Sequence, residues 1–487
     1  MKFSVFKLFL VLFYSCQAQD ILFPDKFQRI QERYQNHYPR PNQPSPPHHP
    51  PVFNRQQWQP SPIWAPFHDK YPPFEQKNVG TSRPFFESFE QFRDILSRGT
   101  TQLTLNIDNI MEKQYPRDNL VFSPLSLQML LATILLASKG QTFDEITKIF
   151  NINSGIFKNS ENDFHQNFGK LIQQTLSSTN KLGAPKFNFG TGVFVTRNSP
   201  IGKSFTSASE KIYQAHVKNI DYRYEPARNI INDWVKSKTE GLIPSFLDEQ
   251  PRGDTKAIIA SAIYFKGEWK ARLHTSDIMW RFKISNNEMK KVNALVSDGT
   301  IPYRFLEEKR LKIVALPYKS SQVSMYVIVP QKPGIEGLRT LKKELTPEII
   351  DDLIGKMKEQ SIQLMLPAMN LSSTVDLENI LGEMGLSTLT DPSRADLSVL
   401  TSNEGIPIDV LRTNRNIRNP GIFFDKIVQK VKIAVTEKGT EAAAATGALI
   451  DRMFIPTINA NQPFLFFIRN DDTKSILFYG SIKDPNP

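Results

Sequence analysis

The sequence predicts an α+β fold, with helices early in the globular region and large sheets after them. Apolar residues recur at helical spacing from residue 89 and become almost continuous near residue 137. Strands, in contrast, are predicted near the C-terminus over residues 430–436, 463–468 and 475–482, which have alternating or largely apolar runs. No internal repeat is visible in the 487 residues. The chain is therefore expected to form one large mixed domain rather than a repeat array.

The helices come first along the chain. Residues 89–96 begin an amphipathic helix that continues through residue 110. Ser123-Pro124 marks a helix entry, and residues 127–137 are apolar on nearly every side. Eleven residues are too few to span a membrane, so this segment is predicted to be a buried helix. Two later helices are predicted over residues 347–357 and 376–385.

Strands follow, and become dense toward the C-terminus. Residues 430–436 alternate Val and Ile with Lys and Ala, the period of a half-buried strand. Residues 463–468 and 475–482, separated by a turn-like Asn-Asp-Asp, predict a hairpin of buried strands. Further strands are predicted over residues 187–198, 255–267 and 323–330.

The first eighteen residues have the pattern of a secretory signal peptide. Lys2 and Lys7 precede and interrupt an apolar run, and small residues follow, which predicts cleavage after Ala18. We therefore expect a secreted, extracellular protein without a membrane span. Cys16, the single cysteine of the sequence, lies in this segment, so the mature protein is expected to have no disulfide.

Residues 19–88 form a distinct extension, rich in Pro, His and Gln. They hold 14 of the 34 prolines and four of the seven histidines, a composition that cannot build a packed core. Its interspersed aromatic residues are compatible with docking onto a partner, although a solvated tail is favoured. Its histidine spacing fits no defined metal site. The predicted organisation is thus a signal peptide (1–18), an extension (19–88) and a globular domain (89–487).

Charge and motifs argue against an enzyme. The formal net charge is +11, but the basic residues are scattered. A soluble basic surface is thus favoured, with a polyanion such as heparin as a weaker candidate ligand and no nucleic-acid partner. Gly-x-Ser-x-Gly, His-Glu-x-x-His and Walker motifs are absent, and three isolated histidines do not suggest a catalytic triad. The Arg-Gly-Asp tripeptide at 252–254 is interpreted as a turn.

Several motifs together resemble the serpin family of serine protease inhibitors. They lie in the expected order over about 350 residues: NLVFSPLS (119–126), NDWV (232–235) with TEG (239–241), AIYFKGEW (262–269), LPY (316–318), ADLS (395–398) and QPF (462–464). The resemblance covers residues 89–487. It implies three β-sheets, about nine helices and an exposed reactive-centre loop at about 437–458.

The resemblance also implies a mechanism and a partner. In inhibitory serpins a target serine protease attacks the loop and forms an acyl-enzyme, and the cut loop then inserts into the main sheet. The partner would be a trypsin-like or a chymotrypsin/elastase-like protease in covalent complex with a monomeric inhibitor. By analogy with tail-bearing arthropod serpins, this protease would belong to an extracellular cascade of immunity, melanisation or clotting. The alternative is a non-inhibitory carrier or binding protein that uses the same fold.

The sequence of the loop favours insertion. In a strand, Thr440, Ala442, Ala444 and Thr446 share one face, and Glu441, Ala443, Ala445 and Gly447 share the other. The first face has no charge, and a buried unpaired carboxylate would oppose insertion. Gly439 gives the backbone freedom where insertion begins. Residues Glu437 to Thr446 are therefore predicted to form the hinge.

The family spacing of sixteen positions from Glu437 places the scissile residue at Met453, with cleavage before Phe454. Arg452, one position earlier, is the alternative and would suit a trypsin-like pocket. Counting favours Met453.

The resemblance assigns a sheet-opening region to Ser123, Ser126, Ser261, Gln429 and Trp269. Ser261 and Gln429 stand where the family usually has Asn and His, and we expect a Ser261–Gln429 contact to replace that pair. Two further features stand apart from this region: residues 401–419 look longer than usual and are expected to form a surface loop, and Asn370 is the single glycosylation sequon.

Overall fold

The computed structural model describes residues 86, 88–152, 161–177, 182–285, 287–297, 299–401, 408–413, 419–437 and 455–485. All of them lie in the unit Ser61–Pro487. The signal peptide, nearly all of the extension, and residues 438–454 fall outside the described residues.

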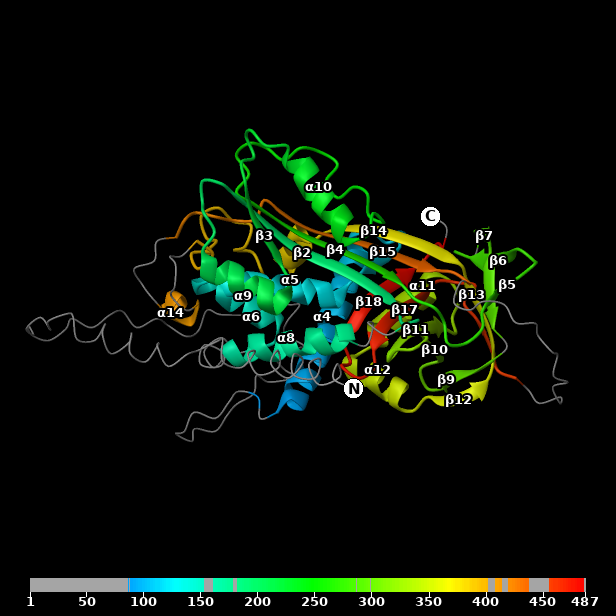
Figure 1. Cartoon of the computed structure of the whole chain (residues 1–487). Helices are drawn as coiled ribbons and strands as arrows, with labels where there is room; N and C mark the ends of the chain where they lie inside the picture. The colour runs from blue at the N-terminus through cyan, green and yellow to red at the C-terminus, as the bar shows by residue number, and fades with distance from the viewer. Residues whose placement is uncertain are drawn as a thin grey trace, which may run out of the picture. The chain divides into compact units, whose positions relative to one another are not determined.

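The main sheet has five strands (Figure 1). Their order is β14 (Met369–Asp376), β15 (Lys426–Val435), β4 (Ala257–Lys266), β2 (Lys186–Thr196) and β3 (His216–Ile220). The pairs β14·β15 and β4·β2 are antiparallel, whereas β15·β4 and β2·β3 are parallel. Strand β4 is central in this order, which matters for the site described below.

Both faces of β4 are covered, which explains its unbroken apolar sequence. Ala257, Ile259 and Ile263 belong to the larger hydrophobic core, whereas Ile258 and Ala260 belong to a second cluster with residues of helix α10 (Ala227–Lys238). Figure 1 shows α10 on one face of the main sheet and α5 (Pro124–Ala137) on the other.

A seven-stranded sheet holds the predicted C-terminal hairpin. Its order is β1 (Leu120–Phe122), β18 (Ile476–Ile482), β17 (Phe464–Asn470), β11 (Val323–Pro330), β10 (Leu311–Pro317), β9 (Thr300–Leu306) and β12 (Lys358–Ser361). Strands β17 and β18 pair antiparallel and every residue in them is buried. The edge strand β12 is fully exposed and polar, a composition that discourages pairing with other chains.

A four-stranded sheet receives the chain after residue 454. Its order is β16 (Thr457–Asn459), β13 (Gln363–Pro367), β8 (Ala294–Ser297) and β5 (His274–Thr275). Between β5 and β8 along the chain, β6 (Trp280–Lys283) and β7 (Met289–Val292) form a separate two-stranded ribbon.

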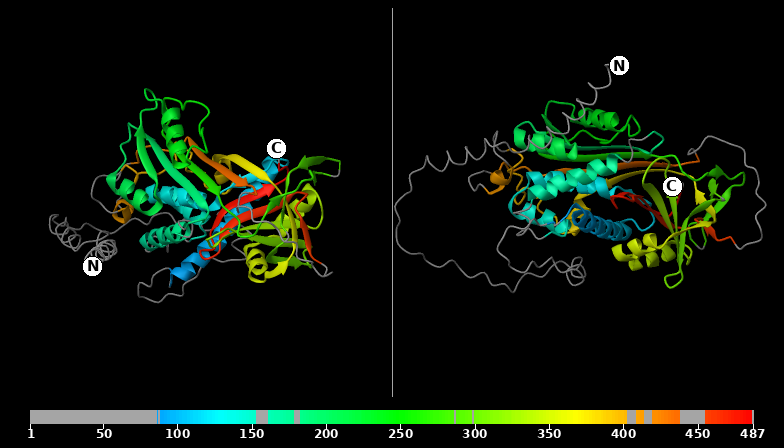
Figure 2. Two further views of the ribbon diagram at one scale, coloured as in Figure 1. Left: turned by 45° about the vertical axis from the view of Figure 1, so that its right-hand side comes forward. Right: turned by 60° about the horizontal axis from the view of Figure 1, so that its bottom comes forward.

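Ten helices lie in the described part of the chain, close to the nine expected. Besides α5 and α10 they are α4 (Phe89–Gln114), α6 (Gly140–Ile149), α8 (Glu161–Ser177), α9 (Lys203–Tyr213), α11 (Ile335–Glu344), α12 (Pro347–Gly355), α13 (Glu378–Glu383) and α14 (Ile408–Thr413). Figure 1 labels α5, α6, α8 and α9 on the same side of the main sheet, and the views in Figure 2 show these blue-green helices as one group. Helix α5 is buried at every position and begins with an N-cap bond from the Ser126 amide to the Ser123 hydroxyl. The α+β prediction is confirmed, with the β6–β7 ribbon added to the three expected sheets. Among the described residues, no helix combines the length and apolar character needed to cross a membrane.

The stretch 401–419 is more than a surface loop, which corrects the expectation from the sequence. Its helix α14 buries Arg412, whose guanidinium donates to the carbonyl oxygens of Leu135 at 2.8 Å and Ser138 at 3.0 Å. These carbonyls lie at the C-terminus of α5, where the last turn lacks intrahelical donors. Glu161 pairs with the same guanidinium, and burial lowers the pKa of Arg412 to about 9. A buried cation therefore caps the helix whose other end carries the predicted sheet-opening serines.

Candidate functional site: the seam between β4 and β15

Strands β4 and β15 lie side by side over eight residue pairs, from Lys426↔Ile258 to Ile433↔Phe265. We call this parallel contact the seam. Strand β15 ends at Val435, and Thr436 and the exposed Glu437 are the last described residues before 438–454. The chain is next described at Ile455 and enters the four-stranded sheet at β16. The seam thus lies directly before the segment predicted to be the reactive loop.

Midway along the seam, four polar side chains form a buried cluster. Gln429 and Ser261 are register partners, and both side chains belong to the face that covers α5. The Gln429 amide donates to the Ser126 hydroxyl at 2.9 Å and to the Ser123 carbonyl at 3.0 Å. Its carbonyl Oε1 accepts the Ser123 amide at 2.7 Å. The Ser126 and Ser261 hydroxyl oxygens are 2.7 Å apart.

The predicted contact between Ser261 and Gln429 is present as register partners on neighbouring strands, and their side chains are linked through Ser126. The Ser126 hydroxyl lies between them and bonds to both, because the N-terminus of α5 packs beneath the seam at this point. The structure brings four residues of the predicted sheet-opening region together: Ser123, Ser126, Ser261 and Gln429. All four are at most 1% exposed, so water cannot replace a hydrogen bond lost here.

This cluster ties both strands of the seam to one helix residue. Gln429 reaches Ser126 from β15, and Ser261 reaches it from β4. If the two strands move apart, Ser126 cannot keep both hydrogen bonds. Each buried bond of this kind contributes about 1 kcal/mol, and an unsatisfied partner costs about 1–3 kcal/mol. The cluster therefore stabilises the closed seam.

Trp269 holds the end of the seam nearest Glu437. Its indole Nε1 donates to the Thr436 carbonyl at 3.0 Å. The ring stacks on Tyr318, with ring centroids 4.3 Å apart and planes at 21°. Trp269 is buried to 1% exposure, so the residue that precedes Glu437 is anchored to the core.

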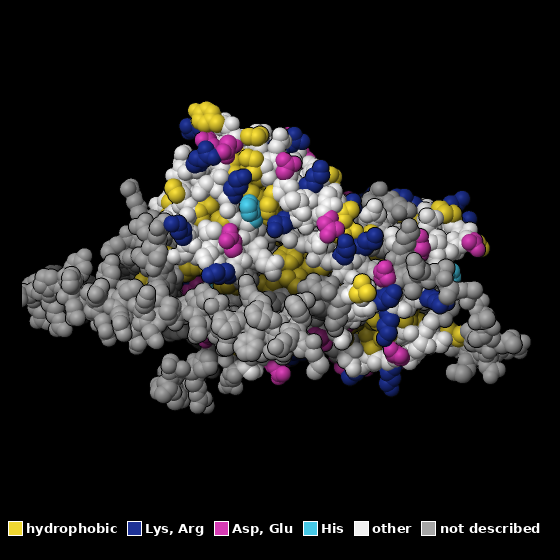
Figure 3. All heavy atoms as spheres, in the orientation of Figure 1, with side chains coloured by type: hydrophobic (Ala, Val, Ile, Leu, Met, Phe, Trp, Pro, Cys, Tyr) yellow, Lys and Arg dark blue, Asp and Glu magenta, His cyan; other side chains and the backbone are white. Residues whose placement is uncertain are grey.

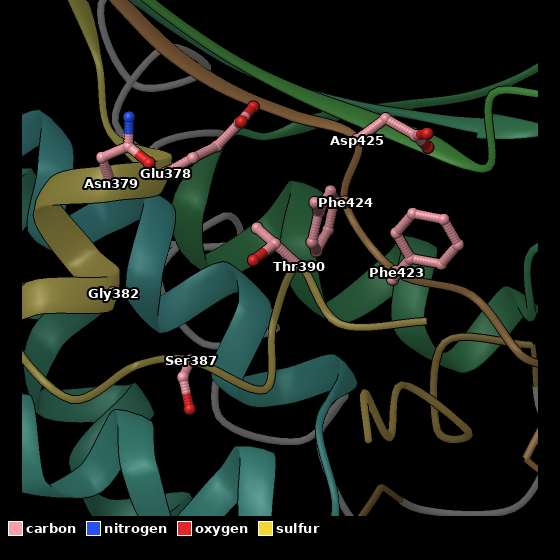
Figure 4. A pocket seen from close by; sticks show the side chains of 8 residues that line it. All are labelled: Glu378, Asn379, Gly382, Ser387, Thr390, Phe423, Phe424 and Asp425. Atoms are coloured by element: carbon pink, nitrogen blue, oxygen red, sulfur yellow. The ribbon is translucent and has the colours of Figure 1, made fainter. Parts of the chain in front are cut away.

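Asp425 closes the opposite end. Its Oδ2 accepts the Lys256 amide at 2.7 Å and the Ala257 amide at 3.2 Å, and its own amide donates to the Ala257 carbonyl at 2.8 Å. Asp425 also lines an open pocket of about 560 Å³, shown in Figure 4. The pocket is lined by Glu378, Asn379, Gly382, Ser387, Thr390, Phe423, Phe424 and Asp425.

Glu378 links this pocket to β15. Its Oε1 accepts the Ile427 amide at 3.1 Å, and Figure 4 shows its side chain extending from α13 toward the strand that leads into β15. Partial burial raises the pKa of Glu378 to about 7, and the nearby negative charge of Asp376 adds to the shift. Near neutral pH, Glu378 therefore changes its charge beside the end of the seam.

Replacing Glu378 with Gln should change how stability depends on pH. The pKa of about 7 in the folded state exceeds the usual 4.5, so the folded protein binds this proton more tightly than the unfolded chain does. The stabilisation is complete below pH 4.5 and is lost as the pH rises through 7. Glu378→Gln should therefore unfold at a higher temperature than the unmodified protein at pH 8, and at nearly the same temperature at pH 4.5.

The measurement is the thermal unfolding midpoint of both proteins at these two pH values and one scan rate. Glu383→Gln, an exposed change on the same helix, is the control and should leave the pH dependence unchanged. If the thermal midpoints of Glu378→Gln and the unmodified protein differ by the same amount at both pH values, the raised pKa of Glu378 is contradicted.

The remaining predicted residues divide into two groups. Of the predicted hinge from Glu437 to Thr446, only Glu437 is described; its other residues and the reactive bond at 452–454 lie outside the described residues. Asn370 lies exposed on β14, opposite Ala434, so its glycosylation stays a prediction. Sequence reasoning missed Asp425 and Arg412. The sequence does show an acidic residue, Asp425, directly before the strand that begins at Lys426. Acidic residues are common at such positions, so this pattern alone does not predict a functional role.

Within the residues that the structure describes, no group of three or more His, Cys, Asp or Glu side chains is arranged to hold a metal ion.

Comparison with known proteins decides the family. A family model described as "Serpin (serine protease inhibitor)" matches residues 98–485. The chain belongs to the serpin family. This serpin is 30% identical to the leukocyte elastase inhibitor of Xenopus tropicalis over 403 residues, which cover 80% of the chain and 99% of the relative. It is 29% identical to serpin B6 of Pongo abelii, over 80% of the chain and all of the relative.

Solved structures support the serpin fold. Native protease nexin-1 with heparin superposes with a TM-score of 0.68 at 24% identity, covering 82% of this chain and 100% of that one. Uncleaved ovalbumin superposes with a TM-score of 0.67 at 21% identity, covering 80% and 100%. The seam therefore belongs to the main sheet of a serpin, and the relatives connect this fold to serine protease inhibition.

Proposed function

We propose that this serpin is a secreted inhibitor that traps serine proteases as a suicide substrate. The protease serine attacks the carbonyl carbon of Met453, or of Arg452 in the alternative. The peptide bond to the next residue breaks, its new amino group takes a proton, and the protease remains bound as an acyl ester. Insertion of the hinge into the seam before water hydrolyses that ester leaves the protease trapped.

The parallel direction of the seam is the observation that supports this proposal. A segment that turns back after Glu437 runs antiparallel to β15. Because β4 is parallel to β15, the same segment is also antiparallel to β4. Insertion therefore replaces one parallel pairing with two antiparallel pairings, which are slightly more stable per residue.

The hinge sequence and the Ser126 cluster both fit a protein that stays uninserted until its loop is cut and then inserts. The face of the hinge that carries Ala442 and Ala444 has no charge, so no ion has to be desolvated on insertion. The Ser126 cluster stabilises the closed seam, and this helps to preserve the uninserted, metastable state until the loop is cut.

Secretion and pathway are parts of the proposal that rest on the sequence alone. The N-terminal signal-peptide pattern supports export, and the extracellular setting suggests a protease cascade of immunity, melanisation or clotting as the target. The second candidate function is a carrier with a serpin fold. It predicts loop cleavage without a covalent complex and without a gain in heat stability.

Incubating the mature protein with trypsin and, separately, with chymotrypsin should give a complex that survives SDS. The ester links the protease serine to the new C-terminus of the cleaved loop, so denaturation does not separate the two chains. Mass spectrometry of the released C-terminal peptide identifies the scissile bond. A peptide that begins at Phe454 assigns Met453, and one that begins at Met453 assigns Arg452.

The control is the same mixture with the protease serine blocked beforehand, which should give no complex. Cleavage of the loop by both active proteases without any SDS-resistant complex, and without higher heat stability of the cleaved protein, would favour the carrier function.

A further inference from the structure

The β6–β7 ribbon presents one face whose charges are not neutralised. The register pairs Arg281 with Lys291 and Lys283 with Met289. Because side chains alternate along a strand, these four residues share one face, which we call the ribbon face. Arg281, Met289 and Lys291 are exposed, and Lys283 is partly exposed. Two cations thus stand directly opposite each other, an arrangement that destabilises a strand pair.

The other face of the ribbon provides an internal contrast. Phe282 and Val292 are completely buried there, and Lys290 forms an ion pair with Asp484 at 2.8 Å. On the ribbon face, the side chains of Arg281, Lys283 and Lys291 have no ion pair or hydrogen bond among the described residues. The fold therefore neutralises the inward cation, whereas the three outward cations have no partner within the described part of the chain.

Exposed apolar side chains adjoin these cations. Met289 is 59% exposed, and Ile278 and Met279, just before β6, are 77% and 52% exposed. In Figure 3, dark-blue Lys and Arg side chains lie beside yellow and some magenta ones at the end of the molecule where Figure 1 labels β6 and β7. Arg and Met are enriched in protein interfaces, so this mixture favours a protein partner over a sulfated polysaccharide.

The ribbon also lies near the predicted reactive bond. The Lys283 amide donates to the Asn461 carbonyl at 2.7 Å, and Asn461 is seven residues after Phe454. Seven extended residues span at most about 25 Å. A protease of about 230 residues is roughly 45 Å across. A protease seated on residues 452–454 therefore has the ribbon within reach of its own surface.

We propose that the ribbon face is a second contact for the target protease, and that it selects proteases with an acidic surface beside the active site. This inference rests on the proposed function, because it assumes that a protease engages the loop. The three cations of the ribbon face attract the acidic surface and accelerate encounter, and Met289 with its apolar neighbours packs against the docked enzyme.

The test compares two probes of opposite charge, the anionic and the cationic isoforms of trypsin. Both cut after Arg, so Arg452 is available to each. The quantity measured is the second-order rate at which native serpin is consumed, counting complex and cleaved protein together. This rate reports encounter with the loop whether or not trapping follows. The SDS-stable fraction is recorded separately and tests the proposed function.

The variant is Arg281→Glu with Lys291→Glu. Consumption by anionic trypsin should slow about tenfold or more, with little slowing for the cationic isoform, and the difference should shrink at high salt. The control is Lys211→Glu with Lys218→Glu, which makes the same charge change at exposed positions of α9 and β3. Equal thermal midpoints would establish that both variants fold.

Equal slowing by the ribbon variant and the control would overturn the inference, because net charge and not the ribbon would then set the rate. Unchanged protease rates together with lost retention on heparin resin would overturn it in favour of a polyanion site. An absent SDS-stable complex with a ribbon-specific rate effect would contradict trapping while supporting the second contact.

Discussion

Under the proposed trapping mechanism, replacing Ala444 with Asp should convert this serpin from an inhibitor into a substrate. Ala444 lies on the hinge face that is expected to turn inward on insertion. An Asp side chain on that face must either enter the sheet interior as an unpaired carboxylate or take up a proton first. Both routes raise the barrier to insertion, whereas hydrolysis of the acyl ester is unaffected.

The outcome is set by the competition between these two steps. A barrier raised by about 2.7 kcal/mol slows insertion about a hundredfold. Most acyl-enzyme would then hydrolyse, releasing active protease and cleaved serpin. The number of serpin molecules consumed per protease inhibited should rise from near one to more than about ten. Titration of a fixed amount of protease, followed by residual activity and SDS gels, measures this number.

Ala443→Asp provides the matched control, because the neighbouring position lies on the outward face together with Glu441. It introduces the same charge one residue away and should leave the stoichiometry within about twofold of the unmodified protein. Equal loss of inhibition in both variants would contradict the assignment of faces.

Replacing Gln429 with Leu should make the native protein lose inhibitory activity faster on storage. Leu has a similar volume, but it removes all three hydrogen bonds that Gln429 makes to Ser123 and Ser126. The Ser123 amide is then left without a partner, whereas the Ser123 carbonyl keeps the Leu127 amide and the Ser126 hydroxyl keeps Ser261. Gln429 is completely buried, so water does not replace these bonds. A loss of about 2–4 kcal/mol from the closed state is expected.

This loss of stability accelerates separation of β4 and β15 when the hydrogen bonds of the cluster are already broken in the transition state for that separation. Every 1.4 kcal/mol then accelerates opening about tenfold, so spontaneous loop insertion or polymerisation should accelerate by at least about tenfold. Incubation at 37 °C with sampling of residual inhibition and native gels measures the rate. Lys430→Leu, at the next position of β15 and outside the cluster, should leave it nearly unchanged. An unchanged half-life of the Gln429→Leu protein would show that the cluster does not hold the seam closed.

The sequence by itself determined the features that depend on local pattern. The buried, mostly apolar α5, the alternation of β15 and the β17–β18 hairpin follow from the burial of side chains at helical or strand spacing. The charge-free face of the hinge also follows from alternation alone. Strand β12 was missed because its four residues are polar and exposed, and such a strand carries no hydrophobic signal.

Only the tertiary structure decided which side chains bond to each other. Ser126 lies between Gln429 and Ser261, although 303 and 135 residues separate it from them. Arg412 caps α5 from 277 residues beyond Leu135. Periodicity tells which face of an element is buried, but not which element packs against that face or in what register. A hydrogen bond depends on that register to within a few tenths of an ångström, and many distant contacts together determine it.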